Sequence, residues 1–267
     1  MQFKLIIIGD EILHGSRKDR HFAFFKQLLA RYGFKLHSVY CLPDERAVLI
    51  SAFARSFADG IPAFVTGGIG ATPDDHTRQA AAAALNLPLE LHSEAAGFIE
   101  TLTLSLGGSL NDVEHARRLN LAVFPEGSEI VPNPYNGVAG FHIREHYFLP
   151  GFPEMSHPMA EWVLHTFYAA RFHQSRSEER KVWLEGQPES KLIPIMEAIE
   201  RDFPNVRTFS LPSVRQTLPG GRIIPAHIEF GLKAESEACA HIESAWQAAL
   251  DALLQNGISW REQPFDN

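Results

Sequence analysis

The stretch TGGIGATPDDHT, residues 66–77, combines a glycine-rich turn with a pair of carboxylates. Its candidate binding residues are Thr66, the glycines Gly67, Gly68 and Gly70, and the aspartates Asp74 and Asp75. Glycines permit a backbone path with positive φ and leave space for a ligand against the main chain. A helix that begins just after such a turn presents N–H groups that favour phosphate. The stretch therefore predicts an anion site, and its two carboxylates need an explanation.

Further carboxylates follow two other apolar runs. Gly9, Asp10 and Glu11 come after KLIII, and Asp44 lies in LPDE at 42–45. In a parallel sheet the carboxyl ends of the strands meet at one edge, so we expect the three loops to converge there. Four or five carboxylates at one edge would repel a phosphate. The conflict is removed if a divalent cation bridges them, or if the ligand donates N–H or O–H groups, as a pterin ring does.

A structural interpretation of the same loop is left open at this point. Thr72, Pro73 and Asp75 fit a capping box, with Thr72 as the cap and Pro73 as the first helical residue. His76 is a candidate ligand, but a lone histidine in a loop is more often solvated or simply hydrogen-bonded. The sequence contains no HExxH spacing and no GxSxG segment, which disfavours a zinc site and a nucleophilic serine.

A second turn-rich segment, NPYNGVAG at 133–140, has two interpretations. Asn, Gly and Pro are ordinary residues of a hairpin end. Alternatively the segment lines a pocket with Asn136 and with backbone amides between Gly137 and Gly140. Residue spacing does not decide between the two.

The order of apolar runs predicts the fold of the first 170 residues. KLIII has the pattern of a strand buried on both faces, and FKLHSVYC and PAFVT are the second and third predicted strands. Helices are expected from about Asp19, from an N-cap at Asp44, and over RQAAAAALNL. Helical patterns follow at 93–119 and at about 154–170, with a hairpin between them. Strands that alternate with helices predict an α/β domain at 1–170, in three α/β/α layers around a mostly parallel sheet.

The composition changes in RFHQSRSEERK, residues 171–181, which is polar and charged and is interpreted as a linker. The following pattern consists of VWLEG, a helix near 189–202, VRTFSL, IIPAHIEFGL, a helix near 235–256 and ISW. This βαββαβ order predicts a small α+β ferredoxin-like domain over 182–267.

Charge and composition limit the partners. The net charge is −8, and no long Lys/Arg cluster is present, which disfavours a nucleic-acid partner. Cys41 and Cys239 show no metal or redox spacing and fit a reducing compartment. No apolar run approaches the roughly 20 residues that cross a bilayer. We therefore expect a cytoplasmic protein that contacts neither nucleic acid nor membrane.

Five stretches, in order, resemble the MoaB/Mog-type molybdopterin-binding domain, and most closely the N-terminal part of CinA-like (competence/damage-inducible) proteins. The stretches are IIIGDEILHG with Asp19 after it, LPDERAVLISAF, TGGIGATPDDHTRQAAAAAL, NPYNGVAGF and FLPGFPEM. GQPESKL at 186–192 is similar to the small domain that follows this module in CinA-like proteins.

The resemblance implies two functions. The first is hydrolysis of a nucleotide pyrophosphate such as ADP-ribose, dependent on Mg²⁺, Mn²⁺ or Co²⁺. Asp10, Asp44 and Asp75 would be the metal ligands, Asp44 and Asp75 would be catalytic, and the glycines would hold the phosphate. The alternative is a non-catalytic protein that binds molybdopterin, a pterin phosphate, in molybdenum cofactor biosynthesis. The resemblance also implies a homo-oligomer.

The chain departs from the family pattern in three places. His21 stands where the family commonly has asparagine, Ala71 replaces the proline of GGxGPT, and the common APG appears as VAG at Val138–Gly140. The changes at Ala71 and Val138 alter loop rigidity. The change at His21 weighs more against catalysis than against binding.

Overall fold

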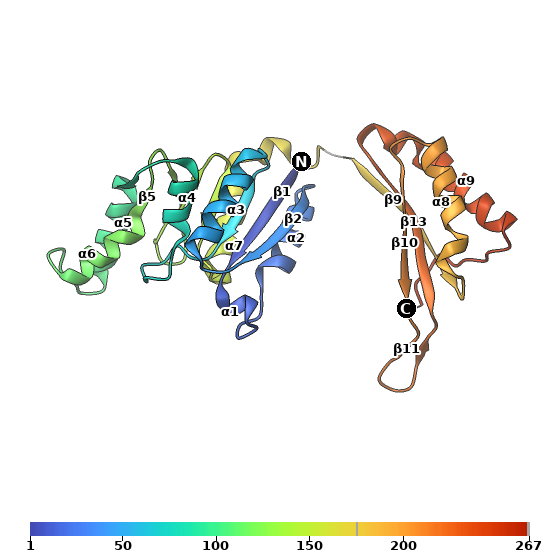
Figure 1. Ribbon diagram of the computed structural model, residues 1–267, viewed down its shortest axis with the longest axis horizontal. Helices are drawn as coiled ribbons and strands as arrows, with labels where there is room; N and C mark the ends of the chain where they lie inside the picture. The colour runs from blue at the N-terminus through green and yellow to red at the C-terminus, as the bar shows by residue number, and fades with distance from the viewer. Residues whose placement is uncertain (175, 266–267) are drawn as a thin grey trace. The chain divides into compact units, whose positions relative to one another are not determined.

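A computed structural model of the chain describes residues 1–174 and 176–265. Residue 175 of the predicted linker and residues 266–267 of the predicted small domain lie outside the described residues. The chain divides into two units, 1–173 and 174–267, and each is described by itself (Figure 1).

The elements of the first unit alternate between strands and helices over its first half. In chain order they are β1 (Gln2–Ile8), α1 (Asp10–Leu13), α2 (His21–Arg31), β2 (Lys35–Leu42), α3 (Arg46–Ala58), β3 (Ala63–Thr66), α4 (Thr77–Leu85), β4 (Leu89–Leu91), α5 (Ser93–Ser105), α6 (Val113–Leu119), β5 (Val123–Pro125), β6 (Glu129–Val131), β7 (Gly140–Ile143), β8 (His146–Leu149) and α7 (Pro153–Phe167).

A six-stranded sheet lies at the centre of this unit, in the order β2-β1-β3-β8-β7-β6. The first four of these strands are parallel, and β7 and β6 continue the sheet in antiparallel pairing. β4 and β5 form a separate antiparallel pair. The mostly parallel α/β sheet confirms the predicted fold class.

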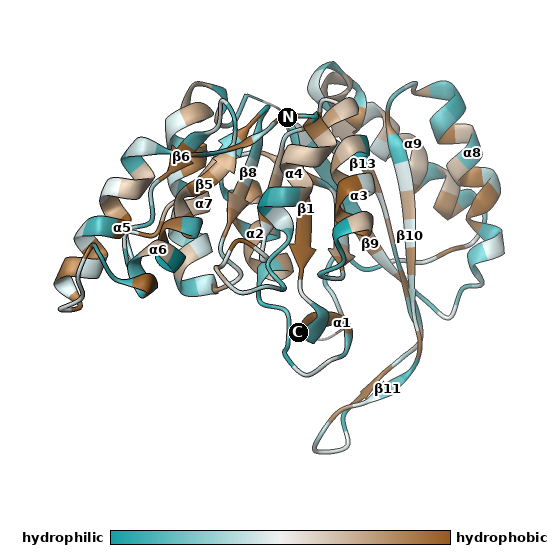
Figure 2. Ribbon diagram, turned by 60° about the vertical axis from the view of Figure 1, so that its left-hand side comes forward, coloured by the Kyte–Doolittle hydropathy of each residue, from teal (hydrophilic) through white to brown (hydrophobic). Residues whose placement is uncertain are grey.

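The β1 sequence explains why helices cover both faces of the sheet. Successive side chains of a strand point to opposite faces, so an unbroken apolar run needs cover on each side. Phe3, Leu5 and Ile7 pack with α2 and α7, whereas Ile6 and Ile8 pack with α3, α4 and α5. Figure 2 shows β1 as a hydrophobic strand among these helices. Each large apolar side chain buried in this way contributes about 1.5–3 kcal/mol.

The predicted N-cap role of Asp44 is wrong. Glu45 occupies the cap position and α3 begins at Arg46. The Asp44 carboxylate instead accepts a hydrogen bond from the Asp10 N–H, with 3.1 Å between the nitrogen and Oδ2. Asp44 therefore connects the loops that follow β2 and β1.

The alternative interpretation of residues 72–75 as a capping box does not describe the start of α4. The Thr72 N–H does donate to Asp75 Oδ2 at 2.9 Å, but residues 72–75 form a turn and α4 begins only at Thr77. The Thr77 N–H donates to the Gly68 carbonyl at 3.0 Å, which ties the start of the helix to the glycine turn.

The second unit is a three-stranded antiparallel sheet, ordered β10-β13-β9, with helices on one face. Its elements are β9 (Ser177–Glu185), α8 (Ile193–Asp202), β10 (Arg207–Ser213), β11 (Gln216–Thr217), β12 (Ile223–Ile224), β13 (His227–Glu235) and α9 (Ile242–Gln255). Leu184 and Phe230 from the sheet pack against Ile195 of α8 and Ala249 of α9.

Three details of this unit differ from the sequence-based expectation. β9 begins at Ser177, inside the stretch interpreted as a linker. The run IIPAHIEFGL is divided between β12 and β13, with Pro225, which has no N–H to donate, between them. The last predicted strand, ISW, is not a strand, and only an isolated bridge joins Trp183 to Arg261 there. Among the helices described in either unit, none is both long and apolar enough to cross a membrane.

Candidate functional site

The predicted loops meet at the carboxyl edge of the parallel strands. In the strand order β2-β1-β3, the connection from β1 to β2 and the connection from β2 to β3 run in opposite directions along the sheet. α/β proteins bind ligands at the carboxyl ends of the strands where this reversal occurs. The Gly9 N–H donates to the Leu42 carbonyl at 3.1 Å, and the Gly67 N–H donates to the Leu149 carbonyl at 3.0 Å. The first bond joins the ends of β1 and β2, and the second joins the ends of β3 and β8.

A cleft of about 780 Å³ opens at this edge. It has the size of a small-molecule site. Nine predicted site residues line it: Gly9, Glu11, Asp44, Gly67, Gly68, Gly70, Asp74, Asp75 and Asn136.

The glycine turn is one that no larger residue could form. Gly67 and Gly68 have φ of +101° and +66°. A Cβ on Gly67 would lie 2.2 Å from the Ile8 carbonyl oxygen, and one on Gly68 would lie 2.2 Å from Thr77 Oγ1. The turn therefore requires glycine both for its dihedral angles and for its close approach to β1 and α4.

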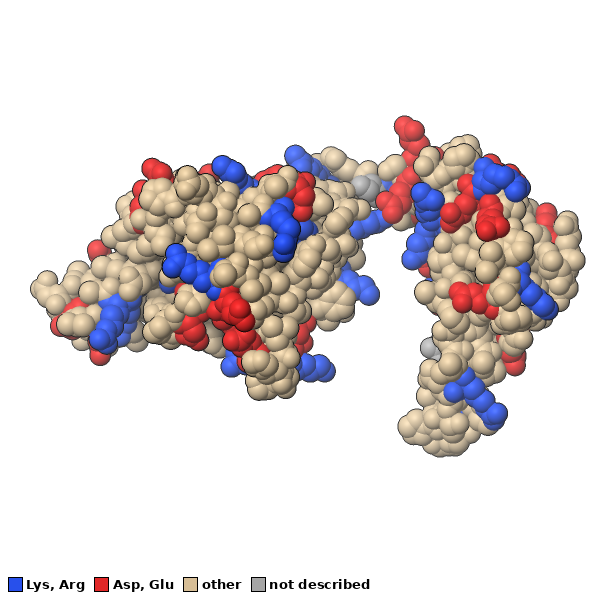
Figure 3. Space-filling view, in the orientation of Figure 1, with Lys and Arg blue, Asp and Glu red and all other residues tan. Residues whose placement is uncertain are grey.

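Asp44 is the central carboxylate of the cleft. Burial raises the pKa of Asp44, the hydrogen bond from Asp10 N–H lowers it, and the charges of Asp10, Glu11 and Asp74 raise it again. Figure 3 shows acidic side chains gathered beside α1 on this face of the first unit. Because these carboxylates repel one another, a cation or a hydrogen-bond donor placed among them would relieve the repulsion.

Asp75 faces its own loop. Its Oδ2 accepts from the Thr72 N–H and from the Thr72 hydroxyl, and a Cβ on Gly70 would lie 2.4 Å from that oxygen. The Arg78 guanidinium donates a hydrogen bond to the Gly70 carbonyl. Burial lowers the pKa of Arg78, and the nearby negative charge of Asp75 raises it by a smaller amount. Asp75 and Arg78 thus hold the turn between the glycines and α4.

Replacing Asp75 with asparagine should change the free energy of unfolding by less than about 1 kcal/mol, because the amide oxygen still accepts from the Thr72 N–H. Asp112→Asn is a matched control, since Asp112 Oδ2 accepts from the N–H of Ser109, also three residues earlier. Urea unfolding of both variants provides the measurement. A loss of several kcal/mol in Asp75→Asn alone would show that the charge itself supports the loop.

A basic segment of the cleft was missed in the sequence analysis. Arg17, Lys18 and Arg20 line the cleft, and they are the cations of SRKDR at 16–20. Arg20 pairs with Glu154 at 2.9 Å, and Arg17 lies 3.6 Å from Glu11. Three cations within four residues, next to the GDE loop, were a signal that sequence reasoning could have used.

An apolar wall completes the cleft. Ile12, Phe152 and Met155 line it, and the Phe152 ring is about half exposed. The Arg17 guanidinium lies 5.9 Å from the centroid of this ring. The cleft therefore joins a region suited to anions to a surface suited to a flat ring.

The remaining predicted residues lie near the cleft without lining it. Asp10 contributes its N–H to Asp44, and Thr66 is the buried last residue of β3. Gly137 has φ of +76° in the turn before β7. Gly140 packs inside the sheet, because a Cβ there would lie 2.4 Å from the Phe148 carbonyl oxygen.

Each of the three departures from the family pattern places a residue in the lining of the cleft: His21, Ala71 and Val138. His21 Nε2 lies 3.0 Å from the Gly151 carbonyl, which can only accept, so Nε2 carries the proton. Burial lowers the pKa of His21, which keeps the ring neutral. His21 thus connects the start of α2 to the loop after β8 as a hydrogen-bond donor, a role that an asparagine amide could also fill.

The predicted metal ligands are not assembled in advance. Within residues 1–174 and 176–265, no three His, Cys, Asp or Glu side chains are arranged to hold a metal ion. Asp75 is turned toward Thr72, away from a shared position with Asp44. Mg²⁺ commonly uses one or two carboxylates together with ligand phosphates, and Asp44 with its acidic neighbours fits that smaller role.

Comparison with known proteins places the chain in a family. Residues 4–170 match the family model described as "Probable molybdopterin binding domain". A "CinA-like protein" of Citrifermentans bemidjiense is 34% identical over 169 residues, which are 61% of this chain and 40% of that protein. A protein of Pyrobaculum calidifontis is 26% identical over 267 residues, covering 98% of this chain and 97% of the relative.

A solved structure supports the same fold. The structure described as the protein CinA with unknown function, from Thermoplasma acidophilum, aligns with a TM-score of 0.54 at 21% identity, over 62% of this chain and 98% of that one. The chain spans 40% of the length of the CinA-like protein of C. bemidjiense. On the match over residues 4–170, the chain belongs to the family of probable molybdopterin-binding domains.

Proposed function

We propose that the cleft binds a small molecule that joins a phosphate group to a heterocycle, with molybdopterin or a related pterin phosphate as the leading class. The observation that carries the proposal is one cleft lined by the Gly67–Gly68 turn, by Arg17 and Lys18, and by the Phe152 ring. The family description concerns molybdopterin and supports the same ligand class.

Each part of such a ligand has a complement in the cleft. The phosphate would lie against the glycine turn at the start of α4, within reach of the basic segment. Lys18 has no ion-pair partner among the described residues and is exposed, so its ammonium is available. The heterocycle would stack on Phe152, and its N–H groups would donate to the Asp44 carboxylate.

The binding test uses titration calorimetry on the full chain with a stable pterin phosphate, with ADP-ribose and with inorganic phosphate. Gly68→Ala should weaken affinity at least about tenfold, because its Cβ would lie 2.2 Å from Thr77 Oγ1. Gly60→Ala is the matched control, since Gly60 has φ of +68° but nothing within 4 Å of its Cβ position. Equal affinities in the two variants, or no binding of any probe, would refute the proposal.

Hydrolysis of a nucleotide pyrophosphate such as ADP-ribose is the second candidate. It is favoured by the carboxylates around Asp44, whose mutual repulsion a divalent cation would relieve. In that case the metal would be held by Asp44 and by the ligand phosphates, and bound Mg²⁺, Mn²⁺ or Co²⁺ would supply a Lewis acid.

The two candidates are separated by incubating the protein with ADP-ribose and each of the three cations. AMP is then measured by chromatography. Metal-dependent release of AMP that disappears in a folded Asp44→Asn variant would establish a hydrolase. Binding without turnover in any metal would leave the protein as a holder of its ligand.

A further inference from the structure

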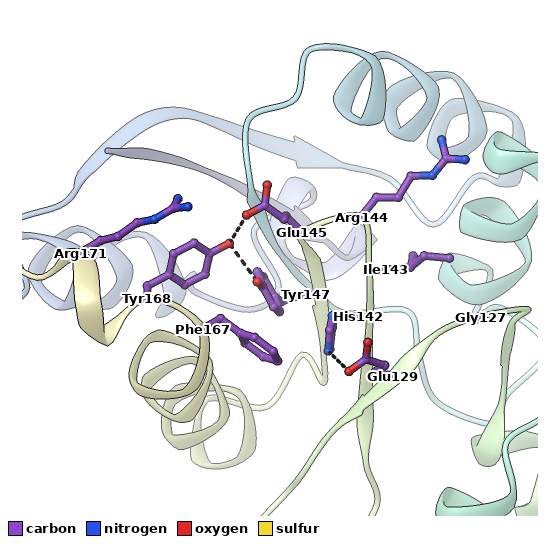
Figure 4. Close-up of a pocket in the computed structure, with 10 residues that line it drawn as sticks. All are labelled: Gly127, Glu129, His142, Ile143, Arg144, Glu145, Tyr147, Phe167, Tyr168 and Arg171. Atoms are coloured by element: carbon purple, nitrogen blue, oxygen red, sulfur yellow. Dashed lines mark hydrogen bonds and ion pairs between the residues drawn. The ribbon is translucent and has the colours of Figure 1, made fainter.

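A second cavity, of about 320 Å³, lies in the same unit at the other end of β8. It surrounds the Arg144–Glu145 turn that precedes β8, whereas the cleft follows that strand. Figure 4 shows it between the end of α7 and the strands β6, β7 and β8. No part of the proposed function uses this cavity, so a ligand bound here would be independent of that function.

A row of side chains across three strands makes one wall. Glu129 of β6 pairs in register with His142 of β7, and His142 pairs with Tyr147 of β8. Residues paired in this way share one face of a sheet. Phe167 of α7 faces the row, with ring centroids 4.7 Å from His142 and 5.7 Å from Tyr147. The wall therefore combines aromatic rings with a carboxylate.

The hydroxyl hydrogens in the cavity are already used. Tyr147 donates to the Tyr168 hydroxyl at 2.9 Å, and Tyr168 donates to Glu145 Oε1 at 3.0 Å (Figure 4). A phenol has a single O–H to donate, so the two hydroxyl oxygens and the carboxylate at the end of the chain can only accept further bonds.

His142 has a buried nitrogen, Nε2, that makes no hydrogen bond among the described residues. Glu129 Oε2 lies 3.6 Å away, within ion-pair distance (dashed line in Figure 4) but beyond hydrogen-bond distance. Burial lowers the pKa of His142, so its ring is neutral and one ring nitrogen is an acceptor. A buried polar atom of this kind is unfavourable unless something pairs with it.

We propose that this cavity binds the ammonium group of a small organic amine. The N–H groups would donate to the Glu129 carboxylate and to His142 Nε2, which accepts when the ring carries its proton on Nδ1, and the cationic end would lie against the Phe167 and Tyr147 rings. Two arginines oppose a cation. The Arg171 guanidinium lies over the Tyr168 ring, 5.9 Å from its centroid. The Arg144 side chain extends away from Tyr168 (Figure 4).

The test titrates the full chain with pentylammonium and follows the ¹⁵N resonances of the histidine rings by NMR. Pentanol and pentanoate are probes of the same length that lack the cation. Pentylammonium should bind at least about tenfold more tightly than either and should shift the His142 Nε2 resonance. His142→Phe keeps an aromatic ring, removes the unpaired nitrogen, and should fold while losing about tenfold in affinity.

Variants that change the charge of the cavity test whether the bound ligand is a cation or an anion. Glu129→Gln should weaken binding of pentylammonium, whereas Arg171→Gln should strengthen it, because each change alters one charge at the cavity. Glu126→Gln, in an exposed residue just before β6 that does not line the cavity, is the control and should leave affinity unchanged. Tighter binding of pentanoate, a loss of affinity in Arg171→Gln, or no saturable binding of pentylammonium would overturn the proposal.

Discussion

Replacing Arg78 with methionine should lower the free energy of unfolding by about 3 kcal/mol and should loosen the glycine turn. Arg78 is 4% exposed, and its guanidinium donates to the carbonyls of Gly70 and Asn120. Methionine retains much of the side-chain volume but leaves both acceptors without this partner, at about 1–3 kcal/mol for each buried group. Part of this destabilisation is offset, because the variant no longer has to bury the positive charge of the guanidinium.

The same variant should weaken ligand binding in the cleft, because Gly70 lines it and depends on Arg78 for its position. Urea unfolding and calorimetric titration with the same probes provide the two measurements. Arg55→Met, at an exposed arginine of α3 that donates to Ser51, is the control and should shift stability by less than about 0.5 kcal/mol. A stable Arg78→Met protein with unchanged affinity would show that the turn holds its shape without the guanidinium.

The glycine turn and the acidic cleft were accessible to sequence reasoning because both depend on local chemistry and on a topological rule. Parallel strands bring their carboxyl ends to one edge, so Asp44 could be placed beside Gly68 without knowledge of any contact. In the structure, a Cβ on Gly68 would lie 3.4 Å from Asp44 Oδ1. The fold class followed from the same alternation of apolar runs.

Other features depend on long-range contacts that a local pattern does not contain. Asp44 has the residue type of an N-cap, but the Asp10 N–H from the loop after another strand takes its carboxylate, so tertiary pairing overrides the cap preference. Thr72 and Asp75 make the hydrogen bonds of a capping box inside a turn, because Thr77 is tied to Gly68 and fixes the start of α4.

The limits of periodicity show most clearly in the second unit and in the basic segment. ISW has apolar residues suited to a strand, but only Arg261 bridges to Trp183 at this place. Arg17, Lys18 and Arg20 lie in a loop with no periodic pattern, so a search for strands and helices passes over them. Their contribution to the cleft becomes visible only when the fold brings the loop against Phe152 and Glu154.

Stability should fall steeply as the pH is lowered from about 6.5 to 4, and His146 should account for about 3 kcal/mol of the loss. His146 is 1% exposed. Burial, together with the nearby Lys4 ammonium, lowers the pKa of His146 from 6.5 to about 4, although its hydrogen bonds and the charge of Asp59 act in the opposite direction. Between these two pKa values, His146 is protonated in the unfolded chain but not in the folded chain, so the free energy of unfolding increases with pH across that range.

The hydrogen bonds of His146 explain why the folded ring stays neutral, and they define the test. Nδ1 lies 2.9 Å from the Arg144 carbonyl and so carries the proton, which leaves Nε2 to accept from the Ser56 hydroxyl at 2.7 Å.

His146→Phe should be less stable than the wild type at pH 7, and its stability should depend less on pH between 6.5 and 4. The matched control replaces the exposed His37 with glutamine and should leave the slope unchanged. Urea unfolding at half-unit pH intervals would measure both slopes. Parallel curves for His146→Phe and the wild type would assign the acid sensitivity to other groups, of which His157, with a pKa also lowered to about 4, is the first to replace.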